Sequence, residues 1–302
     1  MTRHLLEIDD LNPEELHQVL DRCTSAHPVH VLDGRGAALI FEKPNRTRNS
    51  TEMAVVELGG HPIYLTPDQV DIDGRESAED VARTLACYHS VIAARVFDHT
   101  VLERMAGAVT IPVVNLLSDL SHPLQAIADL LTIRAEYGPD LAGRTMTWVG
   151  DYSNVARSLG FACAMQGMGV RFTCPDGYAP PAADLERMAE LGAPWAEHDD
   201  DPADAGKGTH VLVTDAWYSM GQEAEKALRK PIFEPYRVDR AMLDQAEPDA
   251  IFLHCLPAHR GEEVTDEVLD GPQSRVWPEA QNRLAAARGA LEWLVLASET
   301  DR

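Results

Sequence analysis

Five polar segments contain most of the side chains that could carry out chemistry. They are residues 41–50, 122–125, 150–154, 215–222 and 254–261. All except the second adjoin a short apolar run that predicts a β-strand, and open α/β sheets place ligands beyond the carboxyl ends of their strands. These segments are therefore the candidates for a binding or catalytic site.

The first segment reads Phe-Glu-Lys-Pro-Asn-Arg-Thr-Arg-Asn-Ser and precedes a predicted helix that begins near Thr47. The first turn of a helix offers unpaired N–H groups and the positive end of its dipole, which together bind anions. Arg46 and Arg48 add planar guanidinium groups, which suit phosphate. The segment indicates a phosphate site, although a surface turn with solvated arginines fits the same residues.

The second segment, His-Pro-Leu-Gln, starts a long predicted helix. Residues three positions apart lie on the same helix face, so His122 and Gln125 can face one point beyond the helix end. The imidazole could polarise a carbonyl group, and the amide could bind a planar group. A capped helix start with a hydrogen-bonded histidine is the alternative interpretation.

The third and fourth segments each follow a predicted strand. The third lacks the Gly-x-Gly-x-x-Gly pattern that lets a backbone approach a pyrophosphate, but Asn154 could bind a small ligand there. In the fourth, Asp215 could pair with a substrate ammonium group, and Ser219 and Gly221 suit a loop that closes over it. A helix N-cap at residue 154 and an ordinary turn at residue 215 are the alternatives.

The fifth segment contains His254, Cys255 and His259. A zinc site is not expected, because the spacing matches no usual ligand pattern and the sequence has no Cys-x-x-Cys pair. A cysteine nucleophile would need a base and an oxyanion hole, which the sequence does not locate, and a buried structural thiol is the alternative. The acidic residues at 198–204 are interpreted as a solvated loop. We therefore predict no metal site.

The elements that position these segments alternate between strands and helices. Continuous apolar runs predict strands at residues 37–41, 62–65, 91–94, 112–115, 146–149, 170–173, 210–214 and 250–254. Runs without polar alternation are typical of parallel strands that are covered on both faces. Helices are predicted between them, and the first has Asn12 as its N-cap and Pro13 in its first turn.

This alternation predicts an α/β fold with two domains, each an open parallel β-sheet flanked by helices, joined by long helices. Glycine and proline residues at 138–143 indicate a break between the domains. We predict a first domain at residues 1–137, a second at 138–278, and a C-terminal helix at 279–299 that packs back onto the first domain.

The composition excludes several classes of function. The 302 residues include 26 Lys and Arg against 49 Asp and Glu, a formal net charge of −23. This charge disfavours nucleic acid and anionic membranes, so an anionic substrate would need a local cluster of arginines. The N-terminus has no signal-peptide pattern, and no apolar run has the length of a membrane span. Five scattered cysteines suit the reducing cytoplasm.

The segments, in this order, resemble the ornithine carbamoyltransferases from the first helix to the last. Residues 43–48 resemble the family's phosphate loop, 122–125 its carbamoyl motif, 215–221 its ornithine loop and 254–257 its catalytic loop. Arg95 and Arg283 match two further arginines of the family. The aspartate enzymes share the first two motifs but lack the last two, so the resemblance favours ornithine as the acceptor.

The resemblance implies transfer of the carbamoyl group of carbamoyl phosphate to the δ-amine of L-ornithine without a metal or organic cofactor. The implied catalytic residues are Arg95, His122, Cys255 and Arg283. The residues implied to bind carbamoyl phosphate are Asn45, Arg46, Thr47, Arg48, Arg95, His122, Gln125, Cys255, Leu256 and Arg283, and those implied to bind ornithine are Asn154, Asp215, Ser219 and Met220. The resemblance also implies a homotrimer or a multiple of trimers and a cis bond between Leu256 and Pro257. It connects the chain with arginine biosynthesis, while a role in breakdown stays open.

Other functions and two departures from the family pattern stay open. A dehydrogenase could use this architecture, although the glycine fingerprint is absent, and a non-catalytic scaffold would not need five polar motifs. Putrescine or an acylated ornithine could be the acceptor instead of ornithine. The phosphate loop is one residue shorter than in the family, with Asn45 in place of Ser-Thr, and Gln281 stands where glutamate is usual.

Overall fold

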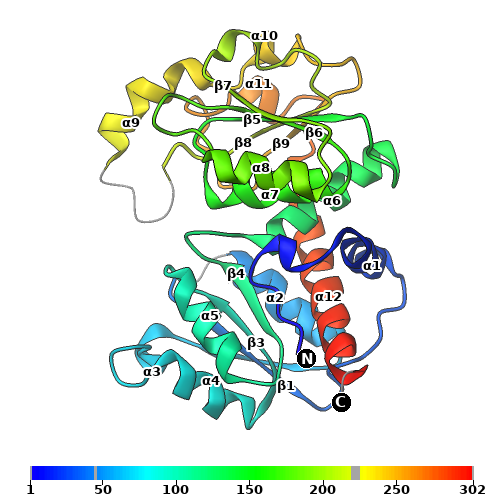
Figure 1. Ribbon diagram of the computed structural model, residues 1–302, viewed down its shortest axis with the longest axis vertical. Coiled ribbons are helices and arrows are strands. Elements are labelled where there is room, and N and C mark those ends of the chain that lie inside the picture. The colour runs from blue at the N-terminus through cyan, green and yellow to red at the C-terminus, as the bar shows by residue number, and fades with distance from the viewer. Residues whose placement is uncertain (1, 44–45, 219–224, 301–302) are drawn as a thin grey trace. The chain divides into compact units, whose positions relative to one another are not determined.

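The computed structural model describes residues 2–43, 46–218 and 225–300 (Figure 1). The chain forms two compact units, each built on a parallel β-sheet. The first unit comprises Met1–Ala128 and Arg283–Arg302, and the second comprises Asp129–Asn282. Both boundaries lie inside long helices, α6 (Pro123–Tyr137) and α12 (Val276–Thr300), so each of these helices belongs partly to both units.

The first boundary differs from the predicted break after Tyr137. It falls earlier because the last turns of α6 bond to the second unit. Arg134 donates to the side chain of Gln166 (2.6 Å), and the Tyr137 hydroxyl donates to the carbonyl of His210 (2.8 Å). Glycine and proline after a helix mark where the helix ends, but the division between the units depends on which side chains each turn contacts.

The first unit contains a four-stranded sheet in the order β2-β1-β3-β4. Its elements before α6 are the 3-10 helix η1 (Ile8–Asp10), α1 (Pro13–Thr24), β1 (Gly36–Phe41), α2 (Arg46–Glu57), β2 (His61–Leu65), α3 (Pro67–Val70), α4 (Ala78–Ala86), β3 (His89–Arg95), α5 (His99–Ala108) and β4 (Val113–Leu117). Ala38 and Ile40 of β1 share one core with Val81 of α4 and Leu102 of α5. Helices α4 and α5 therefore cover one face of the sheet, while α2 and α12 cover the other (Figure 1).

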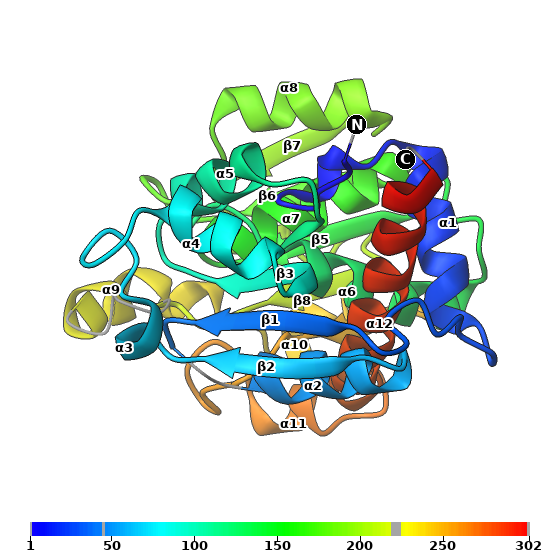
Figure 2. The same ribbon diagram turned by 90° about the horizontal axis from the view of Figure 1, so that it is seen from below.

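Helix α1 begins as predicted, because the Asn12 side chain accepts a hydrogen bond from the backbone N–H of Glu15 and Pro13 occupies the first turn. It lies beside the later turns of α12 (Figure 2). Arg22 pairs with Glu292 (2.6 Å), and Arg288 donates to the carbonyl of Cys23 (2.7 Å). The C-terminal helix thus returns to the unit that contains the N-terminus.

The second unit contains a five-stranded sheet in the order β7-β6-β5-β8-β9. Its further elements are β5 (Thr145–Val149), α7 (Asn154–Met165), β6 (Gly169–Thr173), α8 (Ala182–Leu191), β7 (Ala196–Asp199), the 3-10 helix η2 (Pro202–Asp204), β8 (Val211–Thr214), α9 (Lys226–Phe233), the 3-10 helix η4 (Glu234–Tyr236), α10 (Arg240–Leu243), β9 (Ile251–Leu253) and α11 (Asp266–Leu269). Helices α7 and α8 cover one face, and α10 and α11 cover the other (Figure 1).

The two parallel sheets confirm the predicted α/β fold, and all eight predicted strands are present. The prediction of a loop at 198–204 is wrong in part, because His198 and Asp199 belong to β7. That strand pairs only with β6, at the edge of the sheet, and an edge strand can carry polar residues on its open side. Among the described residues, no helix is long and apolar enough to cross a membrane.

Candidate active site

In the first unit, three elements bring polar side chains together at Thr47. This residue lies in the first turn of α2, and its Oγ1 accepts hydrogen bonds from Arg283 of α12 (2.9 Å) and from Arg95 at the end of β3 (3.3 Å). Thr47 is 3% exposed and Arg95 is 7% exposed. Two guanidinium groups therefore converge on one buried hydroxyl at the start of a helix.

His122 and Gln125 belong to the same group of residues. Arg283 donates a hydrogen bond to Oε1 of Gln125, which is fully buried in the first turns of α6. Burial, and then the positive charges of Arg283 and Arg95, hold the pKa of His122 well below its usual range. The imidazole is consequently neutral at physiological pH, so it can donate a hydrogen bond without adding a charge.

The two arginines of the predicted phosphate loop have other surroundings. Arg46 is exposed at the start of α2. Arg48 donates to the Glu52 carboxylate one turn later (2.7 Å), and its guanidinium lies 3.7 Å from the centre of the Tyr64 ring. Asn45 lies outside the described residues. Of Arg46, Thr47 and Arg48, Thr47 is thus the residue whose side chain bonds to Arg95 and Arg283.

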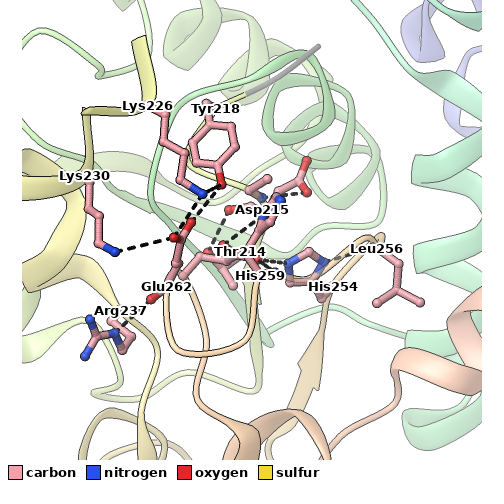
Figure 3. Close-up of polar contacts among 12 residues, drawn as sticks. Thr214, Asp215, Tyr218, Lys226, Lys230, Arg237, His254, Leu256, His259 and Glu262 are labelled. Atoms are coloured by element: carbon pink, nitrogen blue, oxygen red, sulfur yellow. Dashed lines mark hydrogen bonds and ion pairs between the residues drawn. The ribbon is translucent and has the colours of Figure 1, made fainter. Parts of the chain in front are cut away.

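In the second unit, a second group of residues follows strands β8 and β9 (Figure 3). Ligating atoms of Asp215, His254 and Cys255 lie within 4.8 Å of one another. The Asp215 carboxylate accepts from the backbone N–H of Ala216 (2.8 Å). Burial raises the pKa of Asp215, and the hydrogen bond from Ala216 partly opposes this shift. The two sequence segments at 215 and 254 therefore meet at one edge of the sheet, as adjacent parallel strands require.

The thiol of Cys255 is held in its neutral form. Burial, followed by the negative charges of Asp215, Glu279 and Asp129, raises the pKa of Cys255 well above its usual range. A neutral thiol is a poor nucleophile, because the thiolate is the reactive form. The next peptide bond, Leu256–Pro257, is cis, which confirms the expectation from the resemblance.

Two buried glutamates hold the loop after β9. His254 Nδ1 accepts from the backbone N–H of Leu256 (2.9 Å), so the ring carries its proton on Nε2, which lies 3.2 Å from Glu263 Oε1. The backbone N–H of His259 also donates to Glu263, and that of His254 donates to Glu279 (2.9 Å). Sequence reasoning missed Glu263 and Glu279, because a single glutamate in a loop or helix carries no signal that it is buried.

Tyr218 connects the segment after β8 to the same loop (Figure 3). Its hydroxyl donates to Glu262 Oε2 (2.8 Å) and accepts from Lys226 Nζ (2.6 Å). Lys226 and Lys230 also pair with Glu262 Oε1, at 3.1 and 3.5 Å. These contacts occupy Glu262, and those of the previous paragraph occupy both ring nitrogens of His254. Neither the cluster at Asp215 nor the cluster of His259, Glu262 and Glu263 fits a metal ion well.

Of the predicted ornithine-binding residues, the structure describes Asn154 and Asp215. Ser153 rather than Asn154 caps α7, since its Oγ accepts from the backbone N–H of Ala156. Asn154 is half-buried and starts the helix. It follows β5, which pairs with β8, so it and Asp215 lie at the ends of neighbouring strands. Ser219 and Met220 lie outside the described residues.

Comparisons with known proteins match both units. The family model described as the carbamoyl-P binding domain of aspartate/ornithine carbamoyltransferase matches residues 3–135, and the model of the Asp/Orn binding domain matches residues 142–294. The chain belongs to the aspartate/ornithine carbamoyltransferase family. Membership confirms the predicted family and the predicted enzyme class, a carbamoyltransferase.

Relatives of this carbamoyltransferase match along nearly its whole length. The ornithine carbamoyltransferase of Acidothermus cellulolyticus is 46% identical over 307 residues, which cover 99% of this chain and 98% of that protein. The anabolic ornithine carbamoyltransferase of Pyrococcus furiosus is 42% identical over 301 residues, covering 96% and 95%. A solved structure of ornithine carbamoyltransferase from Pyrococcus furiosus superposes with a TM-score of 0.90 and covers 96% of each chain.

Proposed function

We propose that this carbamoyltransferase moves the carbamoyl group of carbamoyl phosphate to the δ-amine of L-ornithine, which yields L-citrulline and phosphate. The observation that carries the proposal is the convergence of Arg95 and Arg283 on Thr47 in a chain similar to ornithine carbamoyltransferases. Such a local cluster of positive charge is what an anionic substrate needs in a protein whose net charge is −23.

Carbamoyl phosphate is assigned to the residues around the start of α2. Thr47, the backbone N–H groups of the helix and the guanidinium groups of Arg46 and Arg48 bind the phosphate. For Arg48 this requires the side chain to leave Glu52 and Tyr64 when the substrate binds. Asn45 is assigned to the same loop from the resemblance alone.

The carbonyl oxygen of the substrate becomes negative in the transition state, and Thr47, Arg95 and His122 are assigned to stabilise it. Donors that are already in place before the reaction avoid the cost of reorganising solvent. The neutral His122 suits this role, because it donates a hydrogen bond without repelling the two arginines. Gln125, Arg283 and the Leu256 carbonyl are assigned to orient the carbamoyl amide.

L-Ornithine is assigned to the second unit. Asp215 pairs with the α-ammonium group, and Asn154, Ser219 and Met220 complete recognition of the amino-acid end. This leaves the δ-amine beside Cys255, which is also assigned to contact carbamoyl phosphate. Binding of a cation stabilises the carboxylate form of Asp215, so it opposes the upward pKa shift that burial causes.

The proposed step is a direct transfer. The lone pair of the neutral δ-nitrogen forms a bond to the carbonyl carbon, the bond between that carbon and the phosphate oxygen breaks, and phosphate leaves with the electron pair. The nitrogen then gives one proton to the departing phosphate. An alkyl amine has an ordinary pKa near about 10, and nearby arginines lower it by repelling the ammonium form. The neutral thiol of Cys255 supports this route over a covalent enzyme intermediate.

We also propose a homotrimer, or a multiple of trimers, that acts in arginine biosynthesis in the cytoplasm. The relative named anabolic supports the biosynthetic direction, and five free thiols suit a reducing compartment. Light scattering tests the assembly, which should have a mass of three times 33.2 kDa or a multiple of that value.

A panel of acceptors tests the proposed reaction. The purified chain is supplied with carbamoyl phosphate and with ornithine, putrescine, N-acetylornithine or aspartate. Ornithine should exceed each competitor in kcat/KM by at least about 100-fold. N-acetylornithine lacks the cationic α-nitrogen that Asp215 is assigned to bind, putrescine lacks the α-carboxylate, and aspartate lacks a side-chain amine. A preference for any other acceptor, or no transfer at all, contradicts the proposal.

A further inference from the structure

A buried arginine outside the motifs, Arg229 of α9, contacts the loops that follow two neighbouring strands. Its side chain is 7% exposed, and its Nη1 lies 2.7 Å from the carboxylate of Asp151, which is 13% exposed. The same Nη1 donates to the carbonyl of Trp217 (3.1 Å), and Nε donates to Glu225 (2.8 Å). One guanidinium group thus bonds to two separate loops and to the N-cap residue of its own helix.

The two loops that Arg229 contacts carry residues assigned to bind ornithine. Asp151 follows β5 and precedes Asn154, and Trp217 follows β8 and comes two positions after Asp215. Strands β5 and β8 are paired in parallel, with Val149 opposite Thr214, so the loops after them are neighbours. Arg229 is therefore a bridge between the loop of Asn154 and the loop of Asp215.

The loop of Asp151 is itself held in place. Trp148 Nε1 and the backbone N–H of Ser153 both donate to the carbonyl of Asp151, each at 2.9 Å. Asp151 is consequently a fixed anchor on the β5 side. Within residues 2–43, 46–218 and 225–300, the backbone of Trp217 makes no direct hydrogen bond to the segment after β5, and Arg229 joins the two.

Aromatic rings shield the bridge from water. The Arg229 guanidinium lies 5.0 Å from the centre of the Tyr178 ring. Phe233 lies next to Tyr178 and to Trp217, with ring centres 4.8 and 6.2 Å apart. In such surroundings a lost hydrogen bond is not replaced by solvent, so the geometry of the bridge depends on the shape of the guanidinium group.

We propose that Arg229 is a positioning residue that fixes the spacing between Asn154 and Asp215 and thereby determines the affinity for ornithine. This inference rests on the proposed function. Lysine cannot replace arginine fully, because a single ammonium group lacks the planar fork that reaches Asp151, Trp217 and Glu225 together.

The test compares R229K and R229M with the wild type in citrulline synthesis. The ornithine KM should rise about 10-fold in R229K and about 100-fold in R229M, because small displacements of binding groups have effects of this size. The KM for carbamoyl phosphate should stay within about twofold of the wild type, since Arg229 bonds to Asp151, Trp217 and Glu225, none of which is assigned to that substrate. Thermal melting identifies any variant that is unfolded, and R229K decides the question if R229M does not fold.

Two controls separate positioning from general stability. R275M removes a bidentate ion pair with Glu136 (2.6 and 2.9 Å) in the same unit and should leave the ornithine KM unchanged. The double variant D151N/R229M removes both charges of the bridge. It should melt at a higher temperature than R229M but keep the high ornithine KM, because the bond to Trp217 is still missing.

The outcomes distinguish this inference from the proposed function. A wild type that makes no citrulline rejects the proposed function. If the wild type is active, the positioning role is rejected by an unchanged ornithine KM in folded R229K, by a KM increase of the same size in R275M, or by recovery of the wild-type KM in the double variant.

Discussion

At the scale of single residues, burial and neighbouring charge decide which groups are charged. His122 lies near two arginines and is held neutral, whereas Cys255 lies near three carboxylates and is also held neutral. Burial disfavours the charged form of either group, so the pKa of the imidazole falls and the pKa of the thiol rises. Both groups are therefore suited to hydrogen bonding rather than to proton transfer or nucleophilic attack at neutral pH.

Arg95→Ala should lower kcat about 100- to 1,000-fold and raise the KM for carbamoyl phosphate, because the guanidinium is assigned to both the ground state and the transition state. Steady-state kinetics with each substrate varied separately measure this effect. Arg46→Ala is the matched control, because Arg46 is exposed and is assigned to the phosphate rather than to the carbonyl oxygen, so its loss should affect kcat much less. A raised KM with an unchanged kcat in Arg95→Ala would contradict the assignment.

The lowered pKa of His122 predicts a pH dependence of stability. Below about pH 6.5 the unfolded chain takes up a proton on this residue and the folded chain does not, so acid favours unfolding. Between pH 7 and pH 5 the wild type should lose up to about 2 kcal/mol more free energy of unfolding than His122→Asn. Urea denaturation at both pH values measures the difference. Equal losses in the two proteins would show that His122 is protonated in the folded state.

At the scale of elements, the sites lie where helices begin and where strands end. Thr47 stands in the first turn of α2, Gln125 in the first turns of α6, and Asp215 and Cys255 follow β8 and β9. Parallel strands present their carboxyl ends at the same edge of a sheet, so residues far apart in sequence become neighbours there. Interior strand positions such as Ala38 and Ile40 are instead used for the core.

The short phosphate loop is the element in which this chain departs from its family. Inserting a serine between Pro44 and Asn45 should change the KM for carbamoyl phosphate only modestly, because Thr47 already contacts Arg95 and Arg283 and the helix N–H groups remain. One lost bond to a charged group is worth about 1.5–3 kcal/mol at most. A gain of several orders of magnitude in kcat/KM would mean that the natural loop is defective.

At the scale of the whole molecule, helices α6 and α12 each belong partly to both units. The N-terminal and C-terminal parts of the chain lie together in the first unit. Glu292 of α12 is 2% exposed and pairs with Arg22 of α1, which is 36% exposed. This ion pair joins positions near opposite ends of the chain within the first unit. The first unit is therefore built from two parts of the chain, and the second unit lies between these parts in the sequence.

Arg22→Met should destabilise the first unit by about 1–2 kcal/mol, because it leaves the buried Glu292 carboxylate without this partner. Chemical denaturation followed by far-UV circular dichroism measures the loss. Arg83→Met is the matched control, since the Arg83–Asp80 pair is about 60% exposed and such pairs contribute little. Equal losses of unfolding free energy in the two variants would show that burial of Glu292 does not make its ion pair with Arg22 more stabilising than an exposed pair.

The class of fold follows from the sequence alone, because continuous apolar runs, helix caps and the order of strands and helices are local patterns. The eight predicted strands and the cap at Asn12 are local features of this kind. The segments that form the site were also predicted, because Asp215, His254 and Cys255 lie at or just after the ends of predicted strands. Their order along the chain carried the family resemblance.

Which polar residues are buried and which of them meet depends on tertiary contacts. Thr47 and Arg48 are adjacent in sequence, yet Thr47 faces Arg95 and Arg283 while Arg48 faces Glu52 and Tyr64. Arg229, Glu263 and Glu279 look like surface residues in the sequence but hold the loops of the second unit. A local pattern cannot show this, because the partners that stabilise a buried charge come from distant parts of the chain.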